Sequence, residues 1–221
     1  ATDIFDEFLE TNHLRSFALE CTNDAYLHDR FHKAMLPAHV VEDLRVFLSG
    51  VRWPLAVRSS SLLEDSQYQP FTGVYDTLML SNDAPDLDER LAQLERAIVQ
   101  VYASTFTKNA KDYLHATPFR LEQEKMAVVI QRVVGSRHDT RFYPDFSGVA
   151  RSRNFYPPAP LKPEDGIAAV ALGMGRTVVE GGQCLTFYPR APRHILQFSA
   201  VDDVLANSQR EIWAIEIGRS T

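Results

Sequence analysis

The sequence predicts an α+β fold, with a helical first part followed by a mixed, mainly antiparallel sheet. Apolar residues recur at helical spacing over residues 2–50 and again over 86–114. From Met126 onward, short β-rich segments alternate with glycine and proline instead. The chain has 221 residues, 45% of them hydrophobic, which is enough to bury a core as one large domain or two small ones.

Three helices are expected before residue 51. The first covers residues 2–12, where Thr2 can cap the helix and Phe5 and Phe8 share an apolar face. The second covers about 24–35. The third begins after Pro37 and stops at Gly50.

The next elements alternate between strand and helix. Pro54 opens a short apolar strand, Val74–Leu80 is β-rich, and one long helix is expected over residues 86–114. Met126–Val134 is almost continuously apolar and is expected to be a central strand. Further short strands are expected at Gly148–Ser152, Ile167–Leu172, Cys184–Tyr188 and Glu211–Ile217. The expected division places a helical part at residues 1–120 and a sheet part at 121–221.

Composition and charge exclude several classes of function. The formal net charge is −6 and no basic block is present, which argues against a nucleic-acid binder. The two cysteines, Cys21 and Cys184, form no C-x-x-C pair. Without a signal peptide or an apolar run of about 20 residues, a cytoplasmic protein with no membrane contact is expected.

The strongest chemical signal is the segment Leu55–Ser61, in which an apolar strand delivers Arg58 into a run of serines that begins with Ser59. A guanidinium is a forked, permanently charged donor that suits phosphate oxygens, and hydroxyl groups add neutral donors. The segment Phe71–Thr77 follows, with Gly73 at a position where backbone can approach a ligand. This pattern predicts a phosphate-binding site.

The same segments resemble the nucleotide-binding domain of the pyruvate phosphate dikinase and phosphoenolpyruvate synthase family. In that family an "AVRSS" strand end recurs with an "F-A-G-x-Y/Q-x-T" loop, as in Ala56–Ser60 and Phe71–Thr77 here. Three further segments follow in the family's order: Lys125–Val134, Ser147–Ala150 and Leu172–Gly181. The resemblance spans about residues 55–188 and implies an ATP-grasp fold, in which two subdomains hold ATP between their sheets.

The resemblance also implies roles for individual residues. Arg58 would be the catalytic contact to the transferred phosphates, with Ser59 beside it. Thr72 and Gly73 would form the tip of a loop that closes over the phosphates, although an ordinary hairpin connection also uses glycine. Backbone groups of Gln131, Arg132 and Val133 would read the adenine edge, unless this strand is merely a buried part of the sheet.

The glycine block at residues 173–182 departs from the family. It matches neither a G-x-G-x-x-G fingerprint nor a P-loop. In the family this block supplies Mg²⁺ ligands, but Arg176 occupies the position of the ligating acid, and a guanidinium cannot bind a cation. Either Glu180 or Gln183 replaces it, or nucleotide phosphates hold the metal, or this copy does not catalyse. Arg176 could alternatively bind a phosphate directly.

The basic residues of the second half leave two interpretations open. Arg137, Arg141, Arg151 and Arg153 follow the strand expected at Met126–Val134. They would either line an entrance for phosphate or balance an acidic surface.

The expected function is that of an ATP-binding domain of a phosphoenolpyruvate synthase-like or dikinase-like phosphotransferase. By resemblance, the phosphoryl group passes from ATP to a histidine of a separate domain and then to pyruvate or another acceptor. The family's upstream "G-G-K" loop, its "T-S-H" motif and its pyruvate-binding barrel have no counterpart in the 221 residues. A piece of a larger protein is therefore expected, partnered by phosphohistidine and phosphoenolpyruvate/pyruvate domains and inactive alone. The alternative is a catalytically degenerate, nucleotide-binding regulatory module.

Overall fold

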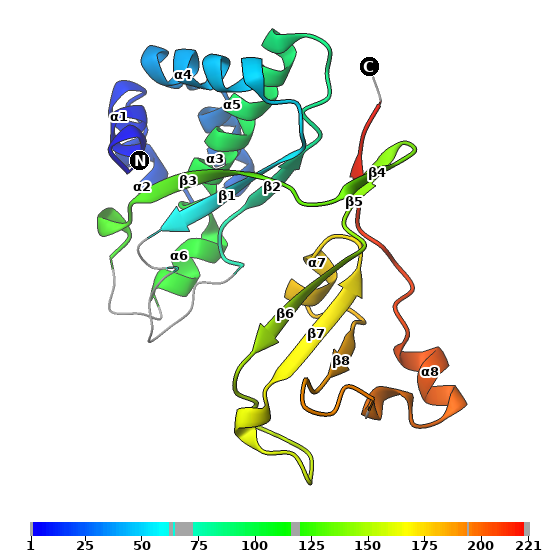
Figure 1. The fold of residues 1–221 in the computed structure, drawn as a ribbon. Helices are drawn as coiled ribbons and strands as arrows, with labels where there is room; N and C mark the ends of the chain where they lie inside the picture. The colour runs from blue at the N-terminus through cyan, green and yellow to red at the C-terminus, as the bar shows by residue number, and fades with distance from the viewer. Residues whose placement is uncertain (1, 62–63, 65–72, 116–119, 194, 219–221) are drawn as a thin grey trace. The chain divides into compact units, whose positions relative to one another are not determined.

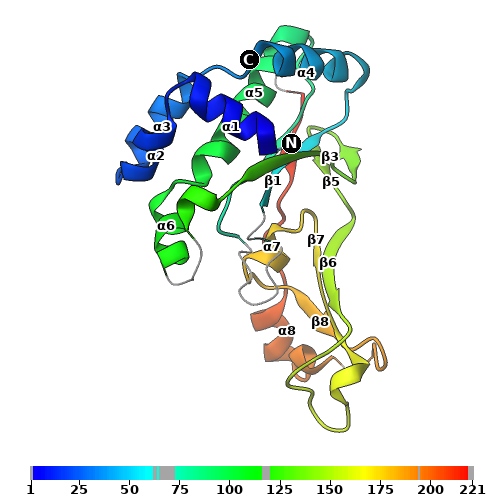
Figure 2. The same ribbon diagram turned by 90° about the vertical axis from the view of Figure 1, so that its left-hand side faces the viewer.

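A computed structural model of the chain describes residues 2–61, 64, 73–115, 120–193 and 195–218. It divides into two compact units (Figures 1 and 2): unit 1 comprises Ala1–Val133 with Gly218–Thr221, and unit 2 comprises Val134–Ile217. The predicted α+β class is confirmed, since helices dominate the first half and small antiparallel sheets follow. No helix in these described ranges is long and apolar enough to cross a membrane.

Unit 1 contains the predicted early helices with small shifts at their ends. A short additional helix, Arg15–Glu20, was not predicted, because six residues carry too little periodicity. The helices are α1 (Thr2–Thr11), α2 (Arg15–Glu20), α3 (Asp24–His32), α4 (Ala38–Gly50), α5 (Leu87–Ser104) and α6 (Lys108–His115). The strands are β1 (Leu55–Ser61), β2 (Thr77–Leu80) and β3 (Met126–Arg132), with a 3₁₀ turn at Leu121–Gln123.

The single helix expected over residues 86–114 is wrong, because the chain breaks between α5 and α6. No glycine or proline marks the break. Instead, the N–H of Lys108, the first residue of α6, donates a hydrogen bond of 2.9 Å to Asp24 of α3. A side chain distant in sequence therefore caps the second helix, and local periodicity does not show this.

The sheet of unit 1 has the strand order β2-β1-β3, and both pairs are antiparallel. The expectation that Met126–Val134 is a central strand is wrong for the described residues, where β1 is central and β3 lies at the edge. One face of β3 packs on the core through Met126, whereas Val129 on the other face is 40% exposed. Apolar composition on both faces therefore did not mean burial on both faces.

An aromatic cluster joins the helices of unit 1. Phe5 of α1 lies 5.0 Å from the Tyr102 ring of α5 and 6.0 Å from the Phe106 ring, measured between ring centroids. Phe8 of α1 contacts Phe31 of α3 and also Tyr102. Such pairs add to the large apolar area that aromatic rings bury. α1 and α3 are thereby packed against α5, which in turn covers one face of the sheet (Figures 1 and 2).

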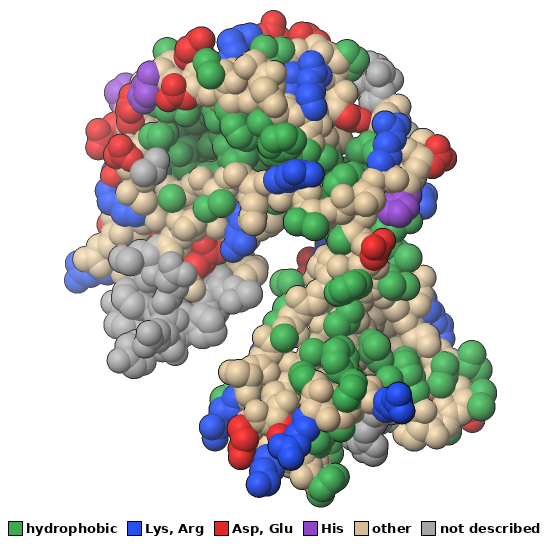
Figure 3. Space-filling model, viewed as in Figure 1, with side chains coloured by type: hydrophobic (Ala, Val, Ile, Leu, Met, Phe, Trp, Pro, Cys, Tyr) green, Lys and Arg blue, Asp and Glu red, His purple; other side chains and the backbone are tan. Residues whose placement is uncertain are grey.

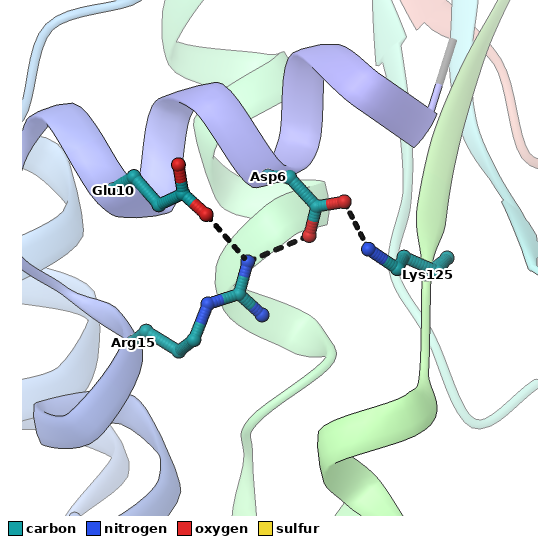
Figure 4. Close-up of polar contacts among 4 residues, drawn as sticks. All are labelled: Asp6, Glu10, Arg15 and Lys125. Atoms are coloured by element: carbon teal, nitrogen blue, oxygen red, sulfur yellow. Dashed lines mark hydrogen bonds and ion pairs between the residues drawn. The ribbon is translucent and has the colours of Figure 1, made fainter.

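A cluster of charged side chains fastens α1 to its neighbours (Figure 4). Asp6 accepts a hydrogen bond of 2.6 Å from Arg15 of α2 and another from Lys125, the residue before β3. Glu10 lies 3.8 Å from the same guanidinium. Burial raises the pKa of Asp6, but the hydrogen bonds and charges of Lys125 and Arg15 outweigh it, so the pKa is lower than usual.

Replacing Asp6 with Asn is expected to destabilise unit 1 by about 1 kcal/mol at neutral pH, because the pairs are partly exposed and screened. A lowered pKa stabilises the fold above the ordinary Asp value, 3.8, and this contribution is lost as the pH falls through the folded-state pKa. Urea unfolding at several pH values tests this. Asp29→Asn, which breaks the exposed Asp29–Lys33 pair, is the matched control. Equal losses in the two variants would contradict the role given to Asp6.

Unit 2 is built from two small antiparallel sheets, with strand orders β6-β7-β8 and β4-β5-β9. The strand expected at Ile167–Leu172 is confirmed, but that expected at Glu211–Ile217 shrinks to two residues. The strands are β4 (Ser136–His138), β5 (Arg141–Tyr143), β6 (Phe146–Arg151), β7 (Ile167–Leu172), β8 (Leu185–Phe187) and β9 (Ile215–Glu216). The helices are α7 (Arg176–Val179) and α8 (Val201–Asn207), with 3₁₀ turns at Pro163–Asp165 and Leu196–Phe198.

Two observations bear on function: the strands that unit 1 contains and the hydrophobic side chains that unit 2 exposes. β3, which the sequence assigns to the second part, pairs with β1 and belongs to unit 1, which includes the chain as far as Val133. In unit 2, hydrophobic side chains gather over β6 and β7 (Figure 3), where the paired residues Phe146 and Leu172 are 67% and 55% exposed.

Candidate functional site

Arg58 lies in the middle of β1 and projects from the face of the sheet opposite the core. Along this strand Val57 and Ser59 are buried, whereas Arg58 between them is exposed. The neighbours of Arg58 in the ladder are Thr77 of β2 and Val129 of β3, which are also exposed. Strand alternation therefore places the guanidinium on an open sheet face.

The Arg58 guanidinium makes no hydrogen bond or ion pair with any residue that the structure describes. A structural pairing with Glu64 is not made, because that carboxylate accepts from the Ser59 hydroxyl at 2.7 Å and from the Ser61 N–H at 3.0 Å. Asp65, the next acid in the sequence, lies outside the described residues. Among the described residues, none therefore occupies the guanidinium.

Ser59 is not brought together with Arg58. Its side chain is 3% exposed and lies on the core face, where its hydroxyl donates to Glu64. Thr72 lies outside the described residues. Gly73 is exposed and has a φ of 79°, in the left-handed region that favours glycine. β1 and β2 pair directly, so this segment joins a hairpin, and the closing loop stays a prediction.

A buried carboxyl group lies beside the end of β1. Glu124 is 4% exposed, and burial raises its pKa to about 7. This value includes a smaller rise from the charge of Glu64 and the opposing effect of hydrogen bonds with Ser61 and Tyr75, which lower the pKa. Burial, and then the charge of Glu124, also raise the pKa of the Tyr75 hydroxyl. Sequence reasoning missed this cluster, because its members come from β1, the segment before β2 and the segment before β3.

Three residues are predicted to bind the adenine edge: Gln131 and Arg132 are the last two residues of β3, and Val133 follows directly. Gln131 is exposed on the same face as Arg58. Val133 is 7% exposed and its N–H donates to the Pro54 carbonyl at 2.9 Å. Hydrogen-bonded pairs alternate in an antiparallel ladder, so the N–H and C=O of Arg132 point away from β1, toward the outer edge. Its guanidinium lies 5.1 Å from the Trp53 ring centroid.

The remaining predicted residues line a pocket of about 430 Å³ within unit 2. Arg176 donates from Nε to Glu180 Oε2 at 2.8 Å, and its guanidinium lies 4.1 Å from the centroid of the Trp213 ring. The Gln183 amide donates to the Ala206 carbonyl at 2.7 Å. Sequence reasoning placed Trp213 only in the strand expected at Glu211–Ile217 and gave it no part in the site.

This pocket does not fit a magnesium ion held by protein side chains. Mg²⁺ requires several hard oxygen ligands at near-octahedral positions. The Glu180 carboxylate is bonded to Arg176, and the guanidinium repels a divalent cation. Within the described ranges, no group of three or more His, Cys, Asp or Glu side chains is suited to a metal ion.

The four arginines of the basic cluster all lie in unit 2 and are exposed. Arg137 on β4 donates to the Asp139 carbonyl at 2.9 Å, and Arg153 lies 6.0 Å from the Phe155 ring centroid. Neither contact distinguishes an entrance for phosphate from a surface that balances charge.

Comparison with known proteins identifies a matching family. The sequence model of one protein family, described as "Pyruvate phosphate dikinase, AMP/ATP-binding domain", matches residues 2–194. The match includes β1, β3 and the pocket-lining residues Arg176 to Gln183. No curated protein matches the chain.

Proposed function

The chain belongs to the family of the pyruvate phosphate dikinase AMP/ATP-binding domain, and from this premise we propose that it is the ATP-binding part of a cytoplasmic phosphotransferase. A phosphoryl group passes from ATP to a histidine of a separate domain and then to pyruvate or another acceptor. The observation that carries the proposal is the Arg58 guanidinium, which is exposed on the open sheet face and unpaired among the described residues.

In this proposal Arg58 is the residue that touches the transferred phosphates. A guanidinium can donate two parallel hydrogen bonds to phosphate oxygens, and such charge-assisted bonds are about twice as strong as neutral ones. The two ladder pairs of Arg58 hold its backbone, so the side chain starts from a rigid strand. Thr72 and Gly73 close over the phosphates, and the left-handed φ of Gly73 allows backbone to approach them.

The adenine edge is read by main-chain groups at the outer end of β3. The N–H and C=O of Arg132 point to the sheet edge, whereas the N–H of Val133 is occupied by Pro54. Arg132 is therefore the principal hinge residue, with the exposed Gln131 side chain on the same face as Arg58. Main-chain recognition explains why side-chain identity is a weak signal here.

Replacing Arg58 with Ala is expected to weaken ATP binding about 10- to 150-fold, because hydrogen bonds to a charged group contribute about 1.5–3 kcal/mol. Isothermal titration of the protein with ATP measures this. The thermal unfolding midpoint should stay within about 2 °C, because the exposed guanidinium makes no hydrogen bond or ion pair with a described residue.

Arg96→Ala provides the matched control, since Arg96 is an exposed arginine of unit 1 on α5. Arg58→Lys should recover part of the affinity, because lysine keeps the charge but loses the forked geometry. Unchanged ATP affinity in Arg58→Ala would remove the central site assignment.

A second candidate function is a regulatory module that binds nucleotide without transferring phosphate. The observation that favours it is Arg176, a guanidinium paired with the nearest carboxylate of the pocket. Labelled ATP added to the protein together with its phosphohistidine domain separates the two functions. Label on histidine supports transfer, whereas nucleotide binding without label supports the regulatory module.

A further inference from the structure

The end of β1 extends beyond the part of the strand that pairs with β2. As far as Arg58, the residues of β1 pair with β2 on one side and with β3 on the other. The register with β2 ends at the Arg58–Thr77 pair, so residues 59–61 pair with β3 only. Arg58 is therefore the last residue of β1 with a ladder partner on both sides, and the strand that follows it is supported by β3 alone.

The carboxylate of Glu64 contacts this end of the strand twice. Its Oε1 accepts from the Ser59 hydroxyl at 2.7 Å, and its Oε2 accepts from the Ser61 N–H at 3.0 Å. Hydrogen-bonded pairs alternate in an antiparallel ladder, and Val133 donates to the Pro54 carbonyl, so the Ser61 N–H points away from β3. Glu64 therefore takes the place that a residue of β2 would hold opposite Ser61.

The groups that Glu64 binds are buried. Ser59 is 3% exposed and Ser61 is 4% exposed. The Ser61 hydroxyl also accepts from the Glu64 N–H at 3.2 Å, so the backbone of Glu64 is held as well. A buried donor that loses its acceptor carries the full cost of its desolvation. Two buried donors at the end of β1 thus depend on one carboxylate.

These contacts act on Arg58 through the backbone. Ser59 directly follows Arg58, and its hydrogen bond to Glu64 fixes its side chain on the core face of the sheet. Because side chains alternate along a strand, holding Ser59 on the core face holds the Arg58 guanidinium on the open face. A rotation of the strand end would turn the guanidinium away from a ligand, and small misplacements of such groups are costly.

We propose that Glu64 is a positioning residue for ATP binding, which fastens the end of β1 and so aims the Arg58 guanidinium, an inference that rests on the function proposed above. Glu64 itself touches no phosphate, because its two oxygens are bonded to Ser59 and Ser61. Its effect on ATP passes through Arg58. This dependence distinguishes it from a residue that only stabilises the fold.

A second carboxyl group makes the position of Glu64 sensitive to pH. Glu124 is 4% exposed, and its Oε1 has no hydrogen-bond partner among the described residues, which favours the neutral acid. Burial raises its pKa to about 7. The Ser61 hydroxyl, which is hydrogen-bonded to both acids, connects Glu124 to Glu64. Loss of the Glu124 proton therefore places a second negative charge beside Glu64.

The charge of Glu124 meets no compensating cation in this cluster. Among the described residues, the ionisable groups that shift its pKa are Glu64 and the Tyr75 hydroxyl. Two charged residues adjacent to the cluster in sequence are engaged elsewhere: Asp76 with Gln100 of α5, and Lys125 with Asp6 of α1. Above about pH 7 the two carboxylates repel each other, and Glu64, which is only half-buried, is the one that can turn to water. The ATP affinity that depends on Arg58 should therefore fall as the pH rises through about 7.

A double-mutant cycle with Arg58 tests the positioning role. Glu64→Ala should weaken ATP binding about tenfold in the natural protein, but less than about twofold in Arg58→Ala, because it acts through Arg58. Glu64→Gln keeps an acceptor oxygen and should recover part of the affinity. Glu122→Gln, an exposed glutamate of the nearby 3₁₀ turn, is the matched control and should change nothing. Isothermal titration with ATP at pH 6 measures all of these affinities.

The pH dependence provides a readout that leaves Glu64 in place. ATP affinity is measured at pH 6 and at pH 8.5 for the natural protein and for Glu124→Gln, so that the titration of ATP itself is common to both. We expect equal affinities at pH 6 and about fivefold weaker binding by the natural protein at pH 8.5, where only its Glu124 is charged. In an Arg58→Ala background this difference should vanish.

The outcomes separate the two proposals. A loss in Glu64→Ala that depends on Arg58, together with the divergence at pH 8.5, supports the positioning role. Equal losses with and without Arg58, unchanged affinity in Glu64→Ala, or parallel pH profiles overturn it. Should Glu64→Ala not fold, Glu64→Gln and the pH comparison decide. Unchanged ATP affinity in Arg58→Ala removes the proposed function as well, whereas a loss there without coupling to Glu64 removes only the positioning role.

Discussion

Replacing Arg90 with Ala should lower the free energy of unfolding by about 3–5 kcal/mol, the largest loss expected for a single substitution in unit 1. Arg90 on α5 is 2% exposed, and its Nη1 lies 3.0 Å from the Leu48 carbonyl and 3.0 Å from the Val51 carbonyl. It also donates to Asn82 Oδ1 at 3.3 Å. Alanine would leave these buried acceptors without the guanidinium and open a cavity between α4 and α5.

Urea unfolding of the variant measures this loss. Arg96→Ala, six residues later on the same helix and exposed, should change stability by less than about 0.5 kcal/mol. Arg90→Lys should fall between the two, because an ammonium group can reach only part of the acceptor set. A loss below about 1 kcal/mol in Arg90→Ala would show that water replaces the guanidinium, contrary to the buried role.

Replacing Glu124 with Gln should stabilise the protein above neutral pH by about 3 kcal/mol. Burial raises the pKa of this carboxyl from 4.5 to about 7, and each pKa unit corresponds to about 1.4 kcal/mol. Between these two values the unfolded chain loses its proton while the folded chain keeps it. The stability of the natural protein therefore falls as the pH rises from 4.5 to about 7, and it is level above.

Glutamine has nearly the same shape and stays neutral, so this contribution to the pH dependence disappears in Glu124→Gln. Chemical unfolding at about pH 4.5, 6 and 8 should show little difference between the proteins at the first value and the full difference at the last. Glu122→Gln, an exposed residue of the 3₁₀ turn that ends just before Glu124, is the control and should be nearly neutral at all three pH values. A Glu124→Gln variant less stable than the natural protein at pH 8 would contradict the prediction.

Local sequence patterns predicted a helix or strand correctly where the residues of that element alone contain the pattern. The helical spacing of Phe5 and Phe8 predicted α1, and the apolar run from Ile167 predicted β7 with its observed bounds. The family resemblance, carried by Ala56–Ser60 and three later segments, is confirmed by the family match. These signals are short in range, so they survive without knowledge of the rest of the fold.

Contacts between segments that are distant in sequence could not be predicted from local patterns. The break between α5 and α6 depends on Asp24, which lies 84 residues before Lys108. The edge position of β3 depends on which strands pair with β1, and strand composition does not reveal this. The pocket of unit 2 combines Arg176 with Arg210 and Trp213, whose proximity arises only from the packing of the segment around Gln209 against β7.

The sequence by itself determined the class of the fold, the family and the identity of Arg58 as a phosphate-binding candidate, because each rests on residue types at short spacing. Only the tertiary structure decided which side chains are exposed and which have hydrogen-bond or ion-pair partners. Strand alternation exposes Arg58 and buries Ser59, and folding pairs Arg176 with Glu180 while leaving the Thr177 hydroxyl without a described partner. Burial and hydrogen bonding depend on neighbours in space, and neighbours in space are set by packing rather than by order along the chain.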